Sequence, residues 1–216
     1  MMKLYHKKEV NVLTWQGRII FLIVISSIFY LFLRNMYLFL SPQSPIQSKT
    51  LVVEGWLPDY ALTMAFLEFR NGHYEEMFIT GSSLPNGGHL TKYTNAAEIA
   101  FDELKLMGMD TTKMHCIPSA PVYRERTYTA ALTLSEYMRK YYPDIKNFNL
   151  YTLGVHGARS WHLFHLAFKK TDMQIGVISV PDKSFDNQKW WNSSKGFRTI
   201  PTEALGYLFV YLFYWP

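Results

Sequence analysis

Residues 151–168 read YTLGVHGARSWHLFHLAF, a stretch that contains a complete strand-to-helix connection. The apolar run 150–153 has the length of a buried strand, Gly154 follows it, and an amphipathic stretch typical of a helix comes after the loop. His156 and Arg159 lie in that loop. The stretch is therefore either an ordinary turn with two polar residues, or the end of a strand that carries a functional site.

The same order of strand and helix recurs on both sides of this stretch. The expected strands are continuous apolar runs, as in strands that helices cover on both faces. Right-handed crossovers then predict an α/β fold, a Rossmann-like three-layer sandwich with a mostly parallel sheet. The expected strands are 50–56, 76–82, 114–120, 148–154 and 174–181, and the expected helices are about 58–71, 94–107, 127–142 and 160–170.

This fold predicts where a ligand would bind. In open parallel sheets, ligands lie beyond the carboxyl ends of the strands. The chain contains no GxGxxG, Walker or GxSxG sequence, so the common dinucleotide, phosphate-loop and serine-hydrolase signatures do not apply. The expected strand ends carry Glu54, Gly55 and Trp56, then Gly81, Ser82 and Ser83, then Ser119 and Ala120, then residues 154–159, and finally Pro181 and Asp182.

The net charge of +5 is concentrated at the N-terminus. Residues 1–18 hold four basic residues against one acidic residue, and Arg34 adds one more positive charge, so residues 41–216 carry only about +1. A nearly neutral domain argues against a nucleic-acid partner. The one cysteine, Cys116, excludes an intramolecular disulfide and argues against a metal site built from cysteines.

An apolar run begins at Ile19, ends at Leu40 and reads IIFLIVISSIFYLFLRNMYLFL. As a helix it would be roughly 33 Å long, about the thickness of a bilayer's hydrocarbon core. No small-residue cleavage motif follows and the basic residues precede the run, which predicts an uncleaved anchor in the inner (plasma) membrane with a cytoplasmic N-terminus. A buried core helix is the alternative. We expect a cytoplasmic tail (1–18), the anchor (19–40), a linker (41–49) and an extracytoplasmic α/β domain (50–216).

The loop of His156 and Arg159 is the first candidate for the site. An arginine beside a helix N-terminus suits an anionic group, because its guanidinium and the free backbone N–H groups face the same way. A histidine can donate or accept a proton near neutral pH. Arg126 and Thr127 follow another strand end and would add a second arginine, although Thr127 is also placed to be a helix N-cap. A hydrogen-bonded structural turn is the alternative for the first loop.

Two carboxylates are candidates for a partner base. Glu54 ends the first expected strand, where a charged residue is rarely a packing residue. Glu98 stands near a helix start, after a Gly/Pro/Asn loop at 83–93 whose position is typical of a site cover. A helix-surface carboxylate stabilised by the helix dipole is the alternative for Glu98. Further residues expected to line the ligand are Gly55, Gly81 and Ser82.

Two other groups of residues are candidates for a function. His162 and His165 share a helix face, but they alternate with aromatic residues in an amphipathic pattern and lack a carboxylate at a matching spacing, so we expect no metal site. The segment 204–215 is apolar and too short to cross a bilayer. It is either a terminal core helix or an aromatic helix at the membrane interface beside the anchor.

A set of short motifs also follows a fixed order along the chain. They are Ile79, Thr80 and Gly81 at a strand end, Glu98 at a helix start, Glu125 with Thr127, His156 with Arg159, and Glu203. This order, over residues 50–210, resembles the bacterial domain-of-unknown-function family 218, typified by YdcF, SanA and ElyC. The resemblance implies a Rossmann-like fold, often behind a single N-terminal anchor, and an association with the cell envelope, without a settled reaction.

Together these features predict a membrane-anchored envelope protein that binds an anionic small molecule, phosphate- or nucleotide-like and either lipid-linked or free, at the carboxyl edge of the sheet. Arg159 and Arg126 would hold the anion, His156 would transfer a proton in hydrolase or transferase chemistry, and Glu98 or Glu54 would orient it or act as base. The cofactor stays open. One alternative is a non-catalytic scaffold that recruits envelope-biogenesis proteins. Another, from fold analogy alone, is a domain that binds an S-adenosylmethionine-type ligand.

Overall fold

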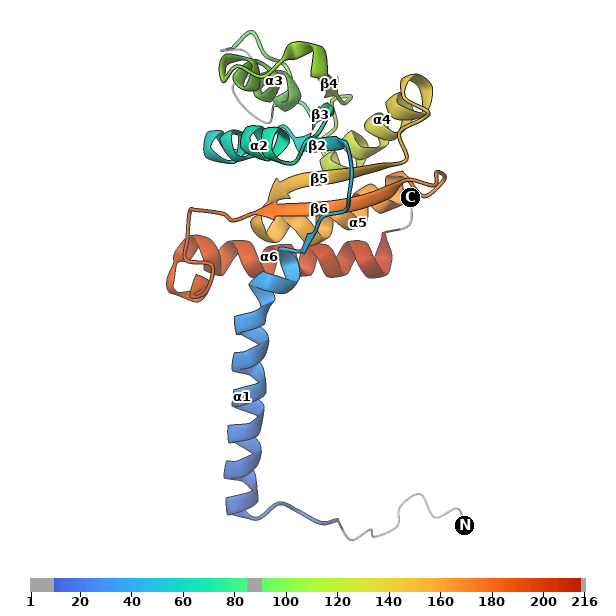
Figure 1. The fold of residues 1–216 in the computed structure, drawn as a ribbon. Helices are drawn as coiled ribbons and strands as arrows, with labels where there is room; N and C mark the ends of the chain where they lie inside the picture. The colour runs from blue at the N-terminus through green and yellow to red at the C-terminus, as the bar shows by residue number, and fades with distance from the viewer. Residues whose placement is uncertain (1–9, 85–90, 215–216) are drawn as a thin grey trace, which may run out of the picture. The chain divides into compact units, whose positions relative to one another are not determined.

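The computed structural model describes residues 10–84 and 91–214 and divides into two compact units, Met1–Asn35 and Met36–Pro216 (Figure 1). Helix α1 (Trp15–Leu40) begins in the first unit. It is long and apolar enough to cross a membrane, and its most apolar window is not buried in protein. This confirms the predicted N-terminal helix that could span a membrane. Residues 1–9 of the predicted basic tail lie outside the described residues.

The second unit is built on a six-stranded sheet with the strand order β1-β6-β5-β2-β3-β4. Neighbouring strands are parallel except β1, which runs antiparallel to β6. The predicted α/β fold with a mostly parallel sheet is confirmed. The strands are β1 (Gln43–Ser44), β2 (Thr50–Glu54), β3 (Glu76–Gly81), β4 (Met114–Pro118), β5 (Asn147–Leu153) and β6 (Gln174–Val180).

Helices cover both faces of this sheet and complete three layers (Figure 1). Successive strand residues point to opposite faces. Leu51 and Val53 of β2 therefore share a core with α2 and α3, whereas Val52 shares one with α4 and α5. Helix α6 packs on α5. The helices of this unit are α2 (Asp59–Asn71), α3 (Ala96–Leu106), α4 (Arg126–Tyr141), α5 (Gly157–Ala167) and α6 (Ser194–Phe213).

The strand order reverses beside the central strand β2. The chain moves from β2 to β3 and β4 on one side, then crosses to β5 and β6 on the other. Such a switch point opens a crevice at the carboxyl ends of the two flanking strands. Here β2 ends at Glu54 and β5 ends at Leu153. The topology thus directs attention to the residues just after these two strands.

Two helix starts differ from the prediction. Helix α5 begins at Gly157 instead of Ser160, so Arg159 lies in its first turn. Helix α4 begins one residue before Thr127, and its N-cap position is Glu125, whose φ of 57° is left-handed. The prediction that Thr127 is the N-cap is therefore wrong, because the chain enters the helix through the turn at Glu125.

The segment 41–49, predicted as a linker, is partly tied to the sheet. It contains β1, and Ile46 exchanges two hydrogen bonds of 2.8 Å with the side chain of Asn149 on β5. Gln43 donates a further bond to the Ser179 carbonyl of β6. A two-residue strand has no periodicity, so the sequence pattern could not show it.

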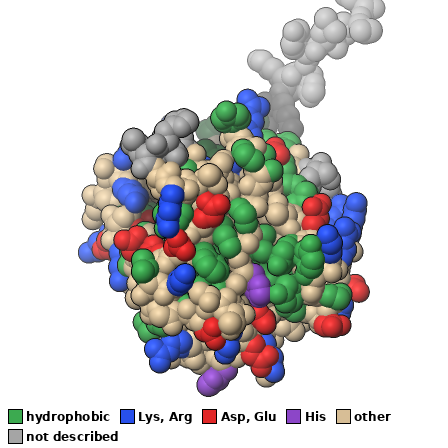
Figure 2. All heavy atoms as spheres, turned by 90° about the horizontal axis from the view of Figure 1, so that it is seen from above, with side chains coloured by type: hydrophobic (Ala, Val, Ile, Leu, Met, Phe, Trp, Pro, Cys, Tyr) green, Lys and Arg blue, Asp and Glu red, His purple; other side chains and the backbone are tan. Residues whose placement is uncertain are grey.

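Figure 2 shows the face of the molecule on the side of α3. Lysine and arginine side chains are interspersed there with aspartate and glutamate around apolar residues. No large area of one charge sign covers the described residues of this face. It looks like an ordinary solvated surface.

Candidate functional site

A cavity of about 880 Å³ lies at the carboxyl edge of the sheet. It lies at the switch point, because the ends of both β2 and β5 line it. The parallel sheet has thus brought together residues that are far apart in sequence. The predicted site residues that line the cavity are Glu54, Gly55, Gly81, Ser82, Arg126, Thr127, His156 and Arg159; other lining residues include Trp56, Tyr123, Glu125, Lys195, Thr199 and Glu203. Residues 85–90 of the predicted covering loop lie outside the described residues.

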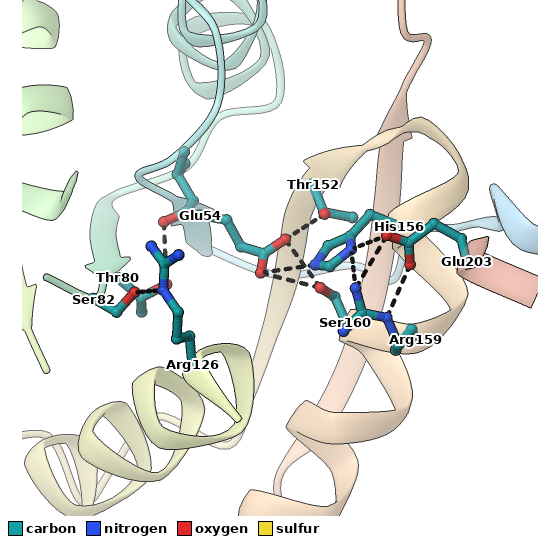
Figure 3. A network of polar contacts seen from close by, with 10 residues as sticks. Glu54, Thr80, Ser82, Arg126, Thr152, His156, Arg159, Ser160 and Glu203 are labelled. Carbon is teal, nitrogen blue, oxygen red and sulfur yellow. Dashed lines mark hydrogen bonds and ion pairs between the residues drawn. The ribbon is translucent and has the colours of Figure 1, made fainter. Parts of the chain in front are cut away.

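Glu54 is a buried carboxylate at the floor of this cavity, only 3 % exposed. A carboxylate in such a place is costly unless hydrogen bonds compensate it. Two hydroxyls do so: Thr152 of β5 donates one bond, and Ser160 of α5 donates another at 3.0 Å (Figure 3). His156 Nε2 lies 4.0 Å from Glu54 Oε1. Glu54 is therefore held by side chains from across the switch point.

His156 lies between two carboxylates (Figure 3). Its Nε2 faces Glu54, and its Nδ1 lies 3.3 Å from Oε1 of Glu203 on α6. The edge of Trp56 meets the imidazole with ring centroids 4.9 Å apart and so restricts the ring's orientation. Among the described residues, Nε2 is buried and has no hydrogen-bond partner. Buried polar atoms are nearly always paired, so this nitrogen is an exception within the described structure.

The charge of Arg159 is neutralised by a bidentate ion pair with Glu203. Its Nε donates to Oε2 at 2.8 Å and its Nη2 donates to Oε1 at 3.0 Å. Nη2 also lies 2.9 Å from His156 Nδ1. Arginine can only donate, so that contact requires an unprotonated Nδ1, whereas a bond from Nδ1 to Glu203 requires a protonated one. The ring can therefore change its protonation while keeping a partner on Nδ1.

Glu203 is an acid of the cavity wall whose pKa departs clearly from its ordinary value. Burial raises the pKa of its carboxyl group, but the hydrogen bonds and positive charge of His156 and Arg159 outweigh burial and lower the pKa to about 2. The carboxylate stays ionised at every ordinary pH. It therefore acts as a fixed negative charge on α6 that orients the side chains of His156 and Arg159.

Arg126 differs from Arg159 in having an uncompensated charge. Its Nε donates to Ser82 Oγ at 2.8 Å (Figure 3). Its Nη2 donates to the Ser83 carbonyl at 3.2 Å. Both partners are neutral, and within the described part of the chain no carboxylate forms an ion pair with Arg126. Its remaining N–H groups are available to a ligand. The anion-binding charge predicted for both arginines is thus free on Arg126 only.

The glycines of the predicted site have a structural explanation. A Cβ on Gly81 would lie 2.3 Å from the backbone nitrogen of Ala97, so only glycine lets β3 end against the start of α3. A Cβ on Gly55 would lie 2.9 Å from the Ala96 carbonyl oxygen at the start of the same helix. After β5, Gly154 has a φ of +45°, a conformation that side chains disfavour. Gly55 and Gly81 line the cavity, so the close approach of β2 and β3 to the start of α3 shapes this part of its wall.

Glu98 does not line the cavity. Its Oε2 accepts the backbone N–H of Thr94 at 2.8 Å and that of Asn95 at 3.2 Å, while the Asn95 side chain accepts the N–H of Ala97. This reciprocal arrangement is a capping box. The expectation that Glu98 turns toward the sheet edge is not met, because its carboxylate caps its own helix. Thr127 lines the cavity, and its side chain forms no hydrogen bond with the described residues.

His162 and His165, the other candidate metal ligands, do not line the cavity. His162 packs against the rings of Tyr207 and Tyr211, and His165 contacts the Trp161 carbonyl at 2.9 Å. Within residues 10–84 and 91–214, no group of three or more His, Cys, Asp or Glu side chains is arranged to hold a metal.

Several residues of the site could not be chosen from strand ends alone. Thr152 lies inside β5, Ser160 inside α5, and Glu203 in a helix of the C-terminal segment. Glu203 entered only through the family resemblance. One signal was available for it: the carboxylate directly precedes eleven residues, 204–214, that contain no charged side chain. A lone charge beside such a segment needs a partner.

Fold and site together define an α/β protein with a Rossmann-like sheet, a charged cavity at the carboxyl edge, and an apolar N-terminal helix that could span a membrane. No protein-family model matches the chain, and no curated protein sequence matches it. Function is therefore inferred from the cavity's own residues.

Proposed function

We propose that the chain is a membrane-anchored protein of the bacterial cell envelope, related to domain-of-unknown-function family 218, whose extracytoplasmic domain binds an anionic, phosphate- or nucleotide-like group. The group is carried on a lipid or is free. The observation that supports this most directly is Arg126, a cavity-lining cation whose partners in the described structure are neutral. An anion that enters the cavity gains a charge-assisted hydrogen bond there without displacing a protein carboxylate.

His156 and Glu54 give the same cavity a means of moving a proton. In the tautomer whose Nδ1–H donates to Glu203, the unpartnered Nε2 of His156 accepts a proton from a hydroxyl or water bound beside the anion, and the resulting imidazolium lies between Glu54 and Glu203. Two carboxylates stabilise that charged form. This arrangement suits general base catalysis in hydrolysis or group transfer of a phosphate ester.

The test compares two neighbouring arginines in the full-length protein. Arg126→Gln removes the free charge, and Arg124→Gln removes an exposed charge that does not line the cavity. Titration calorimetry with inorganic pyrophosphate should show binding to the wild type and to the Arg124 variant. A hydrogen bond to a charged group contributes about 1.5–3 kcal/mol, so Arg126→Gln should weaken binding by roughly 10- to 100-fold.

Equal binding by the Arg126 variant and the wild type would overturn the assignment of the anion site. A protein that binds no phosphate compound and performs no reaction, yet depends on α6 for its role, would instead fit the scaffold alternative. Mass spectrometry of small molecules that co-purify with the full chain would reveal an adenosyl ligand if that alternative were right.

A further inference from the structure

Helix α6 exposes an apolar stripe instead of burying one. Five side chains recur at the spacing i, i+3, i+4, i+7, i+8, which places them on one face of the helix. Each is between 49 % and 70 % exposed. A helix at the surface of a soluble domain turns such a face inward, so this one requires a different partner. The stripe consists of Leu205, Leu208, Phe209, Leu212 and Phe213.

The stripe is fixed in its outward direction by the rest of the helix. Glu203 is held by His156 and Arg159 of the cavity, and Ile200 and Val210 are buried. Rotating the helix to bury the stripe would break that ion pair and expose both aliphatic residues. The residues after Glu203 contain no charge as far as Tyr214, so nothing on this segment opposes an apolar environment.

The end of α1 identifies what covers the stripe. Residues 36–40, the last turns of α1, belong to the same compact unit as α6. Phe39 meets Tyr207 of α6 edge-on with ring centroids 5.6 Å apart, and both Leu38 and Phe39 remain more than 60 % exposed. The apolar surface of α6 is thus continuous with the end of the helix that could span a membrane. The apolar run that precedes Arg34 ends at Leu33, and at 1.5 Å per helical residue this is only about 9 Å before Phe39.

We infer that the stripe of α6 lies in the interfacial layer of the bilayer that α1 crosses. The inference rests on the proposed membrane anchoring. Tyrosines beside the stripe, such as Tyr211, suit that layer because their rings are apolar and their hydroxyls are polar. The inner side of α6 carries Lys195, Thr199 and Glu203 into the cavity wall. One helix diameter, about 10 Å, therefore separates the cavity from the lipid.

Nitroxide accessibility in the full-length protein tests this placement. Single cysteines replace Leu208 and Leu212 on the stripe, Leu106 on α3 as an exposed control, and Ile28 in the apolar helix, all in a Cys116→Ala background. The labelled chains are reconstituted into vesicles of phosphatidylcholine and phosphatidylglycerol. At the positions of Leu208 and Leu212, collisions with oxygen should rise and collisions with a water-soluble nickel chelate should fall severalfold relative to Leu106.

Each other outcome contradicts the inference in a distinguishable way. Labels at 208 and 212 that are as accessible to nickel as the label at 106, with the label at 28 in lipid, would overturn the placement of α6 and leave the anchor intact. Protection from both reagents with spin–spin broadening would show that a second copy covers the stripe. A label at 28 in water would overturn the membrane anchoring on which the inference rests, and leave the anion test at Arg126 unaffected.

Discussion

Glu203 contributes to stability through its ionisation. The carboxyl pKa of about 2 in the folded protein lies below the value of about 4.3 for an unperturbed glutamate. The contribution is therefore fully present above about pH 4.5 and is lost as the pH falls toward about 2, and it amounts to about 2–3 kcal/mol. Glu203→Gln cannot show this dependence. The difference in unfolding free energy between wild type and variant, followed by denaturant unfolding in detergent, should shrink between about pH 6 and pH 3.

Glu75→Gln is the matched control for that experiment. Glu75 pairs with Lys49 at 2.6 Å, but both side chains are more than half exposed. Surface pairs contribute little, so the control should lose less than about 1 kcal/mol at neutral pH. If the difference in unfolding free energy between wild type and Glu203→Gln were the same at every pH, the stabilising contribution of Glu203 would not depend on its charge.

Cys116 should be a poor nucleophile in the folded chain. Burial raises the pKa of its thiol, and the negative charges of Glu98 and Asp102 add to this, to a value of about 11. Only the thiolate reacts, and an unfolded thiol has a pKa of about 8.5. Alkylation by iodoacetamide at about pH 8 should therefore be at least ~100-fold slower in the native protein than in urea. Rates within a few-fold of each other would show that the thiol is exposed and ionised.

At the scale of single residues, the sequence located the site better than it assigned the roles. Glu54, His156 and Arg126 could be predicted because the ends of parallel strands meet at one edge of a sheet. The sequence could not show which arginine lacks a carboxylate partner, because Glu203 lies 44 residues beyond Arg159 and pairs with it only through the packing of α6. The capping role of Glu98 was accessible, since Asn95 stands three residues before it.

At the scale of elements, the join between β3 and α3 is a steric constraint that one substitution tests. Gly81→Ala places a methyl group 2.3 Å from the backbone nitrogen of Ala97, so the helix start must shift. Overpacking against backbone costs about 1–3 kcal/mol or more. Gly108→Ala is the comparison, because its φ of +89° adds strain of about 1–2 kcal/mol while nothing lies within 4 Å.

Thermal unfolding should rank Gly81→Ala below Gly108→Ala, and Gly81→Ala alone should also weaken pyrophosphate binding, because Gly81 lines the cavity. Equal melting temperatures for Gly81→Ala and the wild type would show that the strand–helix join is loose.

The long elements were predictable because each contains enough residues to show a period. The five parallel strands and the helices α2 to α5 agree with their apolar patterns to within a few residues. The predicted helix starts were less accurate than the predicted lengths. Helix α5 begins at Gly157, because the small residues there are helical although they carry no amphipathic signal. Helix α6 was recognised only from its apolar end, because its first half is polar and contains Pro201.

At the scale of the whole molecule, β-α alternation determined the fold and charge asymmetry predicts the orientation. Strand order places the switch point between β2 and β5 by topology alone. The wall that α6 adds to the cavity depends on tertiary packing that no local pattern encodes, which is why the sequence does not indicate Lys195 and Thr199 and indicates Glu203 only through the family resemblance.

The orientation across the membrane is the last prediction. Basic residues precede the apolar run of α1, and the positive-inside rule then places the domain outside the cytoplasm. A membrane-impermeant maleimide applied to intact spheroplasts should label Leu106→Cys, which is 87 % exposed on α3, and should not label Val12→Cys, on the other side of the apolar helix, until the cells are lysed. The reverse pattern would place the domain in the cytoplasm. It would exclude an extracytoplasmic ligand while leaving the cavity and its free arginine in place, so location and chemistry are tested separately.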